Sequence, residues 1–139
     1  MDWSVEVNPF AFLRRRGPGV FHLRMGGCNG CAEMVDAVLR DAKSTAPVEC
    51  SSPRHAEVVV VTGFWAPELA LAALRVISQA PSTCRLVVAG DCALGRGFLV
   101  ERLKLGEVKA SLRIEPDLEI AGCPVETGAL LEGVRRVAG

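Results

Sequence analysis

The sequence lacks an excess of charge of either sign, and it lacks a long apolar run. Its 16 Lys and Arg residues balance its 16 Asp and Glu residues, whereas a nucleic-acid-binding domain normally carries a basic surface. Apolar runs such as residues 58–61 are far shorter than the ~20 residues that span a bilayer. Residues 1–4 have neither the basic start nor the apolar stretch of a signal peptide. We therefore expect no nucleic-acid partner and a cytoplasmic chain that is soluble or peripheral to something larger.

Cysteine is too scarce for a disulfide-rich scaffold. The chain has six cysteines among 139 residues, whereas such scaffolds carry about twice that share or more. A cytosolic chain also keeps its thiols reduced. Six thiols in a reducing compartment indicate metal binding, redox chemistry or buried thiols, and their positions must distinguish these possibilities.

Strand-like and helix-like segments alternate along a single domain. Half of the residues are hydrophobic, enough for one core in a chain of this length. Short β-branched runs predict strands at residues 19–25, 57–63 and 85–90, with a shorter extended piece at 112–114. Apolar residues at helical spacing predict helices at residues 32–42, 67–79 and 127–137. This alternation predicts an α/β fold, in which helices wrap a parallel sheet on both faces.

Four of the six cysteines lie beside predicted strand ends and have nearby glycines. Cys28 and Cys31 follow the first strand, Cys92 follows the third, and Cys123 precedes the last helix. Because all strands of an open parallel sheet end at one edge, we expect these four thiols to meet there. Nearby glycines let a backbone approach an inorganic cluster closely. The cysteines without a nearby glycine are interpreted as structural thiols: Cys50 and Cys84.

Several chemistries remain open for four thiols at one point. Structural zinc usually takes two closely spaced pairs, but here only Cys28 and Cys31 form a pair. Widely spread ligands on glycine-rich loops fit a [4Fe–4S] cluster better than zinc. A thioredoxin-like use of the pair would leave Cys92 and Cys123 unexplained. Core thiols that bind nothing are the remaining alternative.

Four motifs occur in order along the chain: Gly27-Cys28-Asn29-Gly30-Cys31, the run 52–63, Gly90-Asp91-Cys92-Ala93 and Gly122-Cys123-Pro124-Val125. Together they resemble the small subunit of [NiFe] hydrogenases and the related complex I subunit that carries the last cluster before quinone. The resemblance implies a flavodoxin-like [4Fe–4S] domain at residues 20–139, preceded by an arm at residues 1–19. It also implies that one cluster, called proximal, is bound by the four matching cysteines: Cys28, Cys31, Cys92 and Cys123.

In length, the chain resembles the small subunits of the membrane-bound, energy-converting hydrogenases and formate hydrogenlyases. Uptake hydrogenase small subunits carry a secretion signal and a second domain with two further clusters, which we expect to be absent here. The complex I relative typically has two adjacent cysteines at the first position, whereas Asn29 and Gly30 separate them in this sequence.

The resemblance implies an electron-transfer subunit of an oxidoreductase, peripheral on the cytoplasmic face of a membrane. Its implied partners are a NiFe large subunit, a ferredoxin-like subunit and membrane-anchored subunits. A complex I-like, quinone- or sulfur-linked reductase without nickel is the near alternative. A zinc-stabilised binding module is the remote one.

Four further residues are candidates for a supporting role around the cluster. Glu33 could relay protons, although a helix start also favours a solvated carboxylate. Arg54 and His55 could hydrogen-bond the cluster region or a partner, or they could form a salt-bridged loop. Arg96 interrupts a pair of glycines that is usual in the family, so its charge should lie near the cluster or point into a partner. A surface arginine in water is the alternative.

Overall fold

The fold is built on a five-stranded sheet in which all neighbouring strands are parallel. The computed structural model describes residues 17–40, 46–112 and 114–138. The strands are β1 (Gly19–Arg24), β2 (Val48–Glu49), β3 (Val58–Thr62), β4 (Arg85–Ala89) and β5 (Leu118–Ile120). Their order across the sheet is β2-β1-β3-β4-β5, which is the flavodoxin-like order. The α/β, flavodoxin-like fold class expected from the sequence is confirmed.

β3 lies at the centre of the sheet and is buried along its whole length. All five of its residues are buried, and four of them are consecutive valines. β-branched side chains suit a strand that is covered on both faces. In the register of the sheet, Val60 lies opposite His22 of β1 and Val87 of β4. This central strand therefore aligns the ends of its neighbours at the edge where the candidate site forms.

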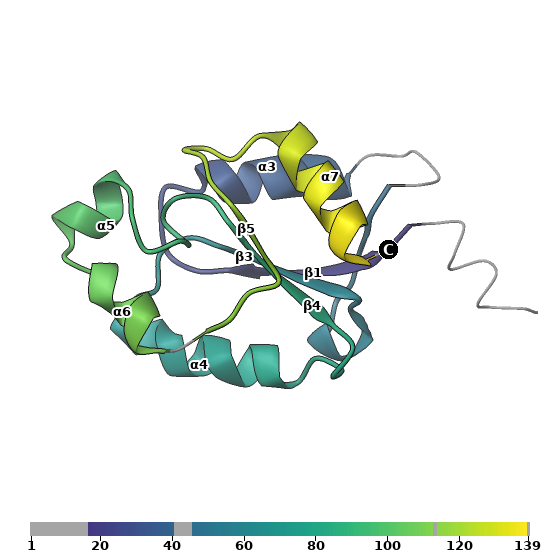
Figure 1. Ribbon diagram of the computed structural model, residues 1–139, viewed down its shortest axis with the longest axis horizontal. Coiled ribbons are helices and arrows are strands. Elements are labelled where there is room, and N and C mark those ends of the chain that lie inside the picture. Colours follow the sequence, from purple (N-terminus) through teal and green to yellow (C-terminus); the bar gives the residue numbers. More distant parts are fainter. Residues whose placement is uncertain (1–16, 41–45, 113, 139) are drawn as a thin grey trace, which may run out of the picture.

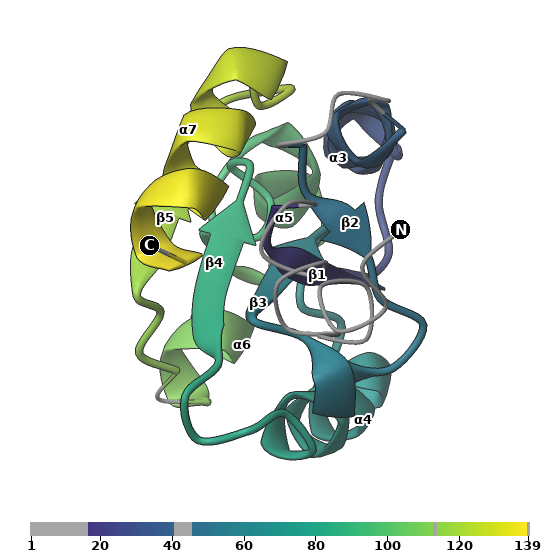
Figure 2. The same cartoon turned by 90° about the vertical axis from the view of Figure 1, so that its right-hand side faces the viewer.

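Helices cover both faces of the sheet (Figure 1). α3 (Gly30–Leu39) and α7 (Thr127–Ala138) lie on one face, and α4 (Pro67–Ser78) and α6 (Gly106–Ser111) lie on the other, as Figure 2 also shows. The short helix α5 (Phe98–Arg102) follows β4 and lies beyond the end of the sheet (Figure 1). Alternate residues of β3 point to opposite faces, so Val58 and Val60 enter the core under α3 and α7, and Val59 and Val61 enter the core over α4.

Most of the expected elements are present. The strands expected at 19–25, 57–63 and 85–90 correspond to β1, β3 and β4, and the helices expected at 67–79 and 127–137 correspond to α4 and α7. The helix expected at 32–42 is α3, which begins two residues earlier at Gly30 and ends at Leu39. Residues 41 and 42 lie outside the described residues.

The prediction of an extended piece at residues 112–114 is wrong. Leu112 follows α6 in a turn, residue 113 lies outside the described residues, and the fifth strand is β5 at Leu118–Ile120. The sequence patterns also do not predict β2, α5, α6 or the 3-10 helix η1 (Pro53–His55). Each of these four elements is too short to show a repeating apolar pattern. The strand β5 is also short, and its pairing with β4 identifies it.

The arm expected at residues 1–19 is described only from residue 17 onward. The division of the chain into this arm and a domain at residues 20–139 therefore stays a prediction, with β1 beginning at Gly19. Among the described residues, no helix combines the length and the apolar character needed to cross a membrane.

Candidate functional site

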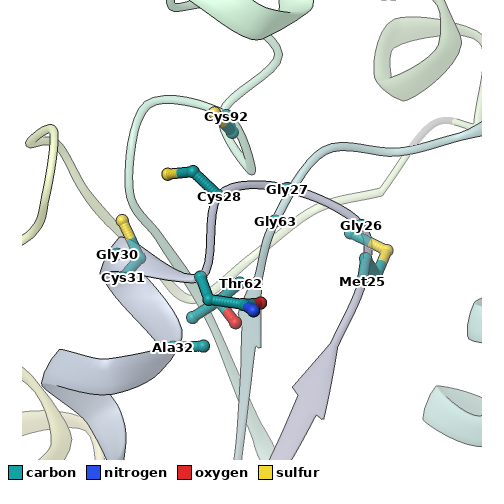
Figure 3. A pocket seen from close by; sticks show the side chains of 11 residues that line it. Met25, Gly26, Gly27, Cys28, Gly30, Cys31, Ala32, Thr62, Gly63 and Cys92 are labelled. Atoms are coloured by element: carbon teal, nitrogen blue, oxygen red, sulfur yellow. The ribbon is translucent and has the colours of Figure 1, made fainter.

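Four cysteines come together at the carboxyl edge of the sheet, and we call them the thiol rim: Cys28, Cys31, Cys92 and Cys123. β1, β4 and β5 end at this edge and lead into the three loops that carry these residues. The Cys92 thiol is within electrostatic reach of the other three thiols, and the Cys31 thiol is within reach of those of Cys28 and Cys123. In Figure 3 the Cys28 and Cys31 sulfurs point to the same side of the loop after β1, with Cys92 on a neighbouring loop.

The loop after β1 turns into α3 through a left-handed residue, Asn29. Its φ is 66°, a conformation that asparagine adopts more readily than most residues. The Asn29 carbonyl accepts a hydrogen bond from the Glu33 N–H at 2.9 Å, so the helix starts directly after the turn. Cys28 therefore lies before the helix and Cys31 lies in its first turn.

Gly90 makes room for the Cys31 thiol at the end of β4. Its φ is +92°, a conformation that side chains disfavour. A Cβ at this position would overlap the Cys31 sulfur. The missing side chain of Gly90 thus lets the loop after β4 approach the first turn of α3. Although Gly90 is near Cys92 in sequence, the thiol that it makes room for belongs to Cys31, on a different loop.

Asp91 joins the loops after β4 and β5. Its backbone N–H donates to the Gly122 carbonyl at 2.9 Å, and its Oδ1 accepts from the Gly122 N–H at 2.9 Å. These bonds connect the residue before Cys92 to the residue before Cys123. Sequence reasoning misses this role, because Gly122 lies 31 residues away. The one feature of the sequence that points to this role is the position of an acidic residue directly before a cysteine of the rim.

Burial and mutual repulsion keep two of the thiols protonated. Burial is the main reason that the pKa values of Cys31 and Cys92 lie above the usual range for a thiol. The other thiols of the rim and the Asp91 carboxylate raise both pKa values further, and a backbone hydrogen bond from Val125 partly offsets the rise at Cys31. Because metals bind thiolates, a metal group would bind here with release of protons.

The four thiols of the rim are a donor set that suits an iron–sulfur cluster. Within the described residues, no three His, Cys, Asp or Glu side chains converge closely enough to hold one metal ion. A [4Fe–4S] cluster takes four thiolates, one at each iron, so its ligands lie farther apart than the ligands of one zinc ion. The rim offers four thiols from three loops, with the Gly90 backbone close to one of them. These residues therefore fit such a cluster.

Two of the four supporting candidates lie on elements that reach the thiol rim. Glu33 is exposed in the first turn of α3. Arg96 lies in the loop after β4, with its Nε 3.9 Å from Asp91 Oδ1 and its side chain 64% exposed. The environment of Arg96 is thus a carboxylate on one side and water on the other.

Arg54 and His55 do not lie at the thiol rim. They belong to η1, which precedes β3. Residues before a parallel strand lie at the amino edge of the sheet, opposite the edge where the strands end. The expectation that these two side chains hydrogen-bond the cluster region is therefore wrong, because they lie at the opposite edge of the sheet. Their contact with a partner stays a prediction.

The two cysteines without glycines nearby in the sequence also lie away from the thiol rim. Cys50 and Cys84 are partly buried against the core that includes α4. The Cys50 sulfur lies 3.7 Å from the His55 carbonyl oxygen, and Cys84 directly precedes β4 at the amino edge. Both positions agree with their interpretation as structural thiols.

The chain matches one known protein family over most of its length. The family model described as NADH ubiquinone oxidoreductase, 20 kDa subunit, matches residues 28–137. The chain belongs to this family. The match includes all four cysteines of the thiol rim, and the resemblance expected from the motifs is confirmed.

The relatives of this chain are subunits with several different names. The chain is 31% identical over 122 residues to a probable membrane-bound hydrogenase subunit of Pyrococcus furiosus, covering 86% of this chain and 72% of the relative. It is 28% identical over 144 residues to formate hydrogenlyase subunit 7 of Escherichia coli, covering 100% of this chain and 56% of the relative. It is 33% identical over 84 residues to an F(420)H(2) dehydrogenase subunit of Methanosarcina mazei, covering 60% of this chain and 45% of the relative.

A solved structure shares the fold. A chain of the membrane-bound sulfane sulfur reductase, an archaeal respiratory membrane complex, superposes with a TM-score of 0.64 at 20% identity, covering 94% of this chain and 73% of that chain. At this identity the likeness shows the fold alone.

Proposed function

We propose that this chain carries one [4Fe–4S] cluster on the thiol rim and transfers electrons within a membrane-associated [NiFe] hydrogenase complex. The observation that carries the proposal is the meeting of four cysteines from three loops at one edge of the sheet. The membrane-bound hydrogenase and formate hydrogenlyase relatives support this class of complex. The cluster would be the proximal one, nearest to the nickel–iron site of a large subunit.

The residues of this chain would hold the cluster close to the protein surface. When bound, a [4Fe–4S] cluster accepts and donates single electrons. Cys28 and Cys123 are exposed, whereas Cys31 and Cys92 are half-buried. The rim would therefore cover one side of the cluster and leave the other side toward a docked partner. Such a position shortens the distance to a redox group on that partner.

The partners in this function are a NiFe large subunit, a ferredoxin-like subunit and membrane-anchored subunits. A nickel–iron site uses two cysteine pairs, and the one close pair in this chain, Cys28 and Cys31, belongs to the thiol rim. The chain would thus be one subunit of an oxidoreductase whose nickel site lies on a partner. We place it peripherally on the cytoplasmic face of the membrane, held by the partner subunits.

A second candidate is a subunit of a quinone- or sulfur-linked reductase without nickel. The match to the F(420)H(2) dehydrogenase relative favours this alternative, and a chain of a sulfane sulfur reductase has the same fold. Both candidates use the same cluster on the same rim, so they differ only in the partner subunit. A zinc-stabilised module fits less well, because structural zinc usually takes two closely spaced cysteine pairs and the rim has one, Cys28 and Cys31.

The test is metal analysis of the complex purified through a tag on this chain. Serine in place of any thiol-rim cysteine should abolish or convert the electron paramagnetic resonance (EPR) signal of the proximal cluster, because a four-iron cluster needs four thiolates. Cys50→Ser and Cys84→Ser are the matched controls and should leave iron and signal unchanged. If Cys50→Ser removed the signal and Cys92→Ser retained it, the ligand assignment would be wrong.

Nickel distinguishes the two candidates. Iron together with nickel in the complex supports the hydrogenase, as do two cysteine pairs in the sequence of the large subunit. Iron without nickel supports the reductase. Zinc without iron, in a colourless complex, would overturn both.

A further inference from the structure

The hydrogen-bond ladder between β4 and β5 ends next to the thiol rim, and a side chain continues it. Ala89 pairs with Ile120 in the last step of the register, and the Gly90 N–H donates to the Ile120 carbonyl at 2.7 Å. The next N–H on this side, that of Gly122, donates to Asp91 Oδ1 at 2.9 Å. The Asp91 N–H also donates to the Gly122 carbonyl at 2.9 Å, so one backbone bond and one side-chain bond join the two loops after the strands end. The side-chain bond is the stronger of the two, because a carboxylate is a stronger acceptor than a neutral carbonyl.

The backbone carbonyl of Asp91 also closes the loop that contains Cys92. The Asp91 carbonyl accepts from the Arg96 N–H at 3.0 Å, so the turn that contains Cys92 closes on Asp91. The Asp91 side chain is 28% exposed, and the Arg96 guanidinium at 3.9 Å is its basic neighbour. Asp91 thus contacts both the loop of Cys92 and the loop of Cys123.

We propose that Asp91 is a positioning residue for the cluster, which sets the separation of Cys92 from Cys123 through Gly122 and lowers the midpoint potential through its charge. This inference rests on the proposed function and deepens it. A fixed negative charge beside a cluster disfavours the more negative, reduced form. Arg96 offsets this charge only in part, because its exposed side chain is screened by water.

Two substitutions separate the hydrogen bond from the charge. Asp91→Asn keeps an oxygen acceptor for the Gly122 N–H and removes the charge, whereas Asp91→Leu removes both. In the complex purified through a tag on this chain, Asp91→Asn should retain the proximal-cluster EPR signal and shift its midpoint potential upward in a redox titration. Asp91→Leu keeps only the backbone bond from the residue 91 N–H to the Gly122 carbonyl, and it should lose most of the signal.

Asp117→Asn is the matched control. The Asp117 carboxylate also accepts a backbone N–H, that of Leu86 at 2.8 Å, and pairs with Arg85 at 3.5 Å, but it lies before β5 at the amino edge of the sheet. This variant should keep the wild-type signal and potential. The proposal is overturned if Asp91→Leu keeps the wild-type signal, or if Asp91→Asn shifts the potential no more than Asp117→Asn does.

Hydrogen exchange distinguishes failure of this inference from failure of the proposed function. A wild-type complex with no cluster signal from this chain would refute the proposed function, yet exchange in peptides that cover residues 118–123 would still test the link between Asp91 and Gly122. Asp91→Leu should exchange faster there than wild type, and Asp91→Asn should exchange as wild type does. Equal exchange in all three proteins would overturn the positioning role.

Discussion

Gly90 is a position where one added carbon should disrupt the thiol rim. Gly90→Ala places a Cβ on the Cys31 sulfur, in a backbone conformation with φ +92°. The conformation alone should destabilise the fold by on the order of 1–3 kcal/mol. Because Cys31 must move to relieve the overlap, we expect most of the cluster to be lost. Iron content and the EPR signal of the purified complex measure this loss.

Gly128→Ala is the matched control for Gly90→Ala. Gly128 lies in α7, and a Cβ there meets no other atom within 4 Å. Alanine has a higher helix propensity than glycine, by about 1 kcal/mol in a helix interior and by less at the second residue of a helix, so this variant should keep its iron and be slightly more stable. Wild-type iron content in Gly90→Ala would contradict the close approach of β4 to Cys31.

Arg96 should influence the cluster less than its place in the sequence indicates. A cation near the cluster favours the reduced form, so Arg96→Gln should lower the midpoint potential. Asp91 lies 3.9 Å from the guanidinium and the arginine side chain is 64% exposed, and both facts weaken its field. In redox titrations we expect a downward shift that is smaller than the upward shift from Asp91→Asn. A larger shift, or an upward one, would show that the guanidinium points at the cluster.

A buried polar network joins β1 and β3 to α3, the helix that starts at the thiol rim. His22 Nε2 lies 2.8 Å from Thr62 Oγ1, and His22 Nδ1 lies 3.5 Å from Asp36 Oδ1. Arg24 forms an ion pair with the same aspartate. Burial, followed by the charge of Arg24, lowers the pKa of His22 to about 4, although Asp36 acts in the opposite direction. The imidazole is therefore neutral in the folded protein at neutral pH.

The free energy of unfolding should fall as the pH drops through the window from 6.5 to about 4. In this window the unfolded chain binds a proton at His22 and the folded chain does not, so acid favours the unfolded state. The expected loss between pH 7 and pH 5 is about 2 kcal/mol. Urea-induced unfolding at low protein concentration, followed at pH 7, 6 and 5, measures it.

His22→Gln tests whether this histidine is the cause. Glutamine keeps a polar group near Thr62 but does not titrate. The loss of stability between pH 7 and pH 5 should shrink in this variant. If the pH dependence stayed the same as in wild type, another group would be responsible.

The molecule as a whole exposes apolar side chains on two of its helices. The larger ones belong to α4, to α5 and to the turn after α5: Leu69, Leu71, Phe98 and Leu103. α5 follows the loop of Cys92, and its first residue, Phe98, is 71% exposed. Exposed apolar surface of this kind marks contacts with other proteins. We therefore expect the chain expressed without partners to self-associate or to lose its cluster.

Size-exclusion chromatography with light scattering, combined with iron analysis, tests this expectation. Phe98→Ser should reduce self-association, because it removes an exposed ring without touching a cysteine. A stable, monodisperse and iron-loaded monomer of the wild-type chain would argue against an obligate complex.

Local features of the sequence are sufficient to predict the fold class and the members of the thiol rim. The valine run at residues 58–61 identifies a strand buried on both faces, because β-branched residues suit that environment. Glycines nearby in the sequence distinguish the four rim cysteines from Cys50 and Cys84, and the structure places these two groups apart. Short elements such as β5 and α5 escape prediction, because a few residues carry no periodic signal.

Contacts between segments depend on the tertiary structure. Strand order brings Asp91 to Gly122 and Gly90 to Cys31, although each pair is distant in sequence. Arg54 and His55 precede β3 and so lie at the amino edge, a placement that spacing between motifs does not reveal. Distance along the chain carries no information about these relations, because parallel pairing brings strand ends together whatever the length of the connections. The choice of neighbours in the sheet comes from burial of both faces at once, which is a property of the whole fold.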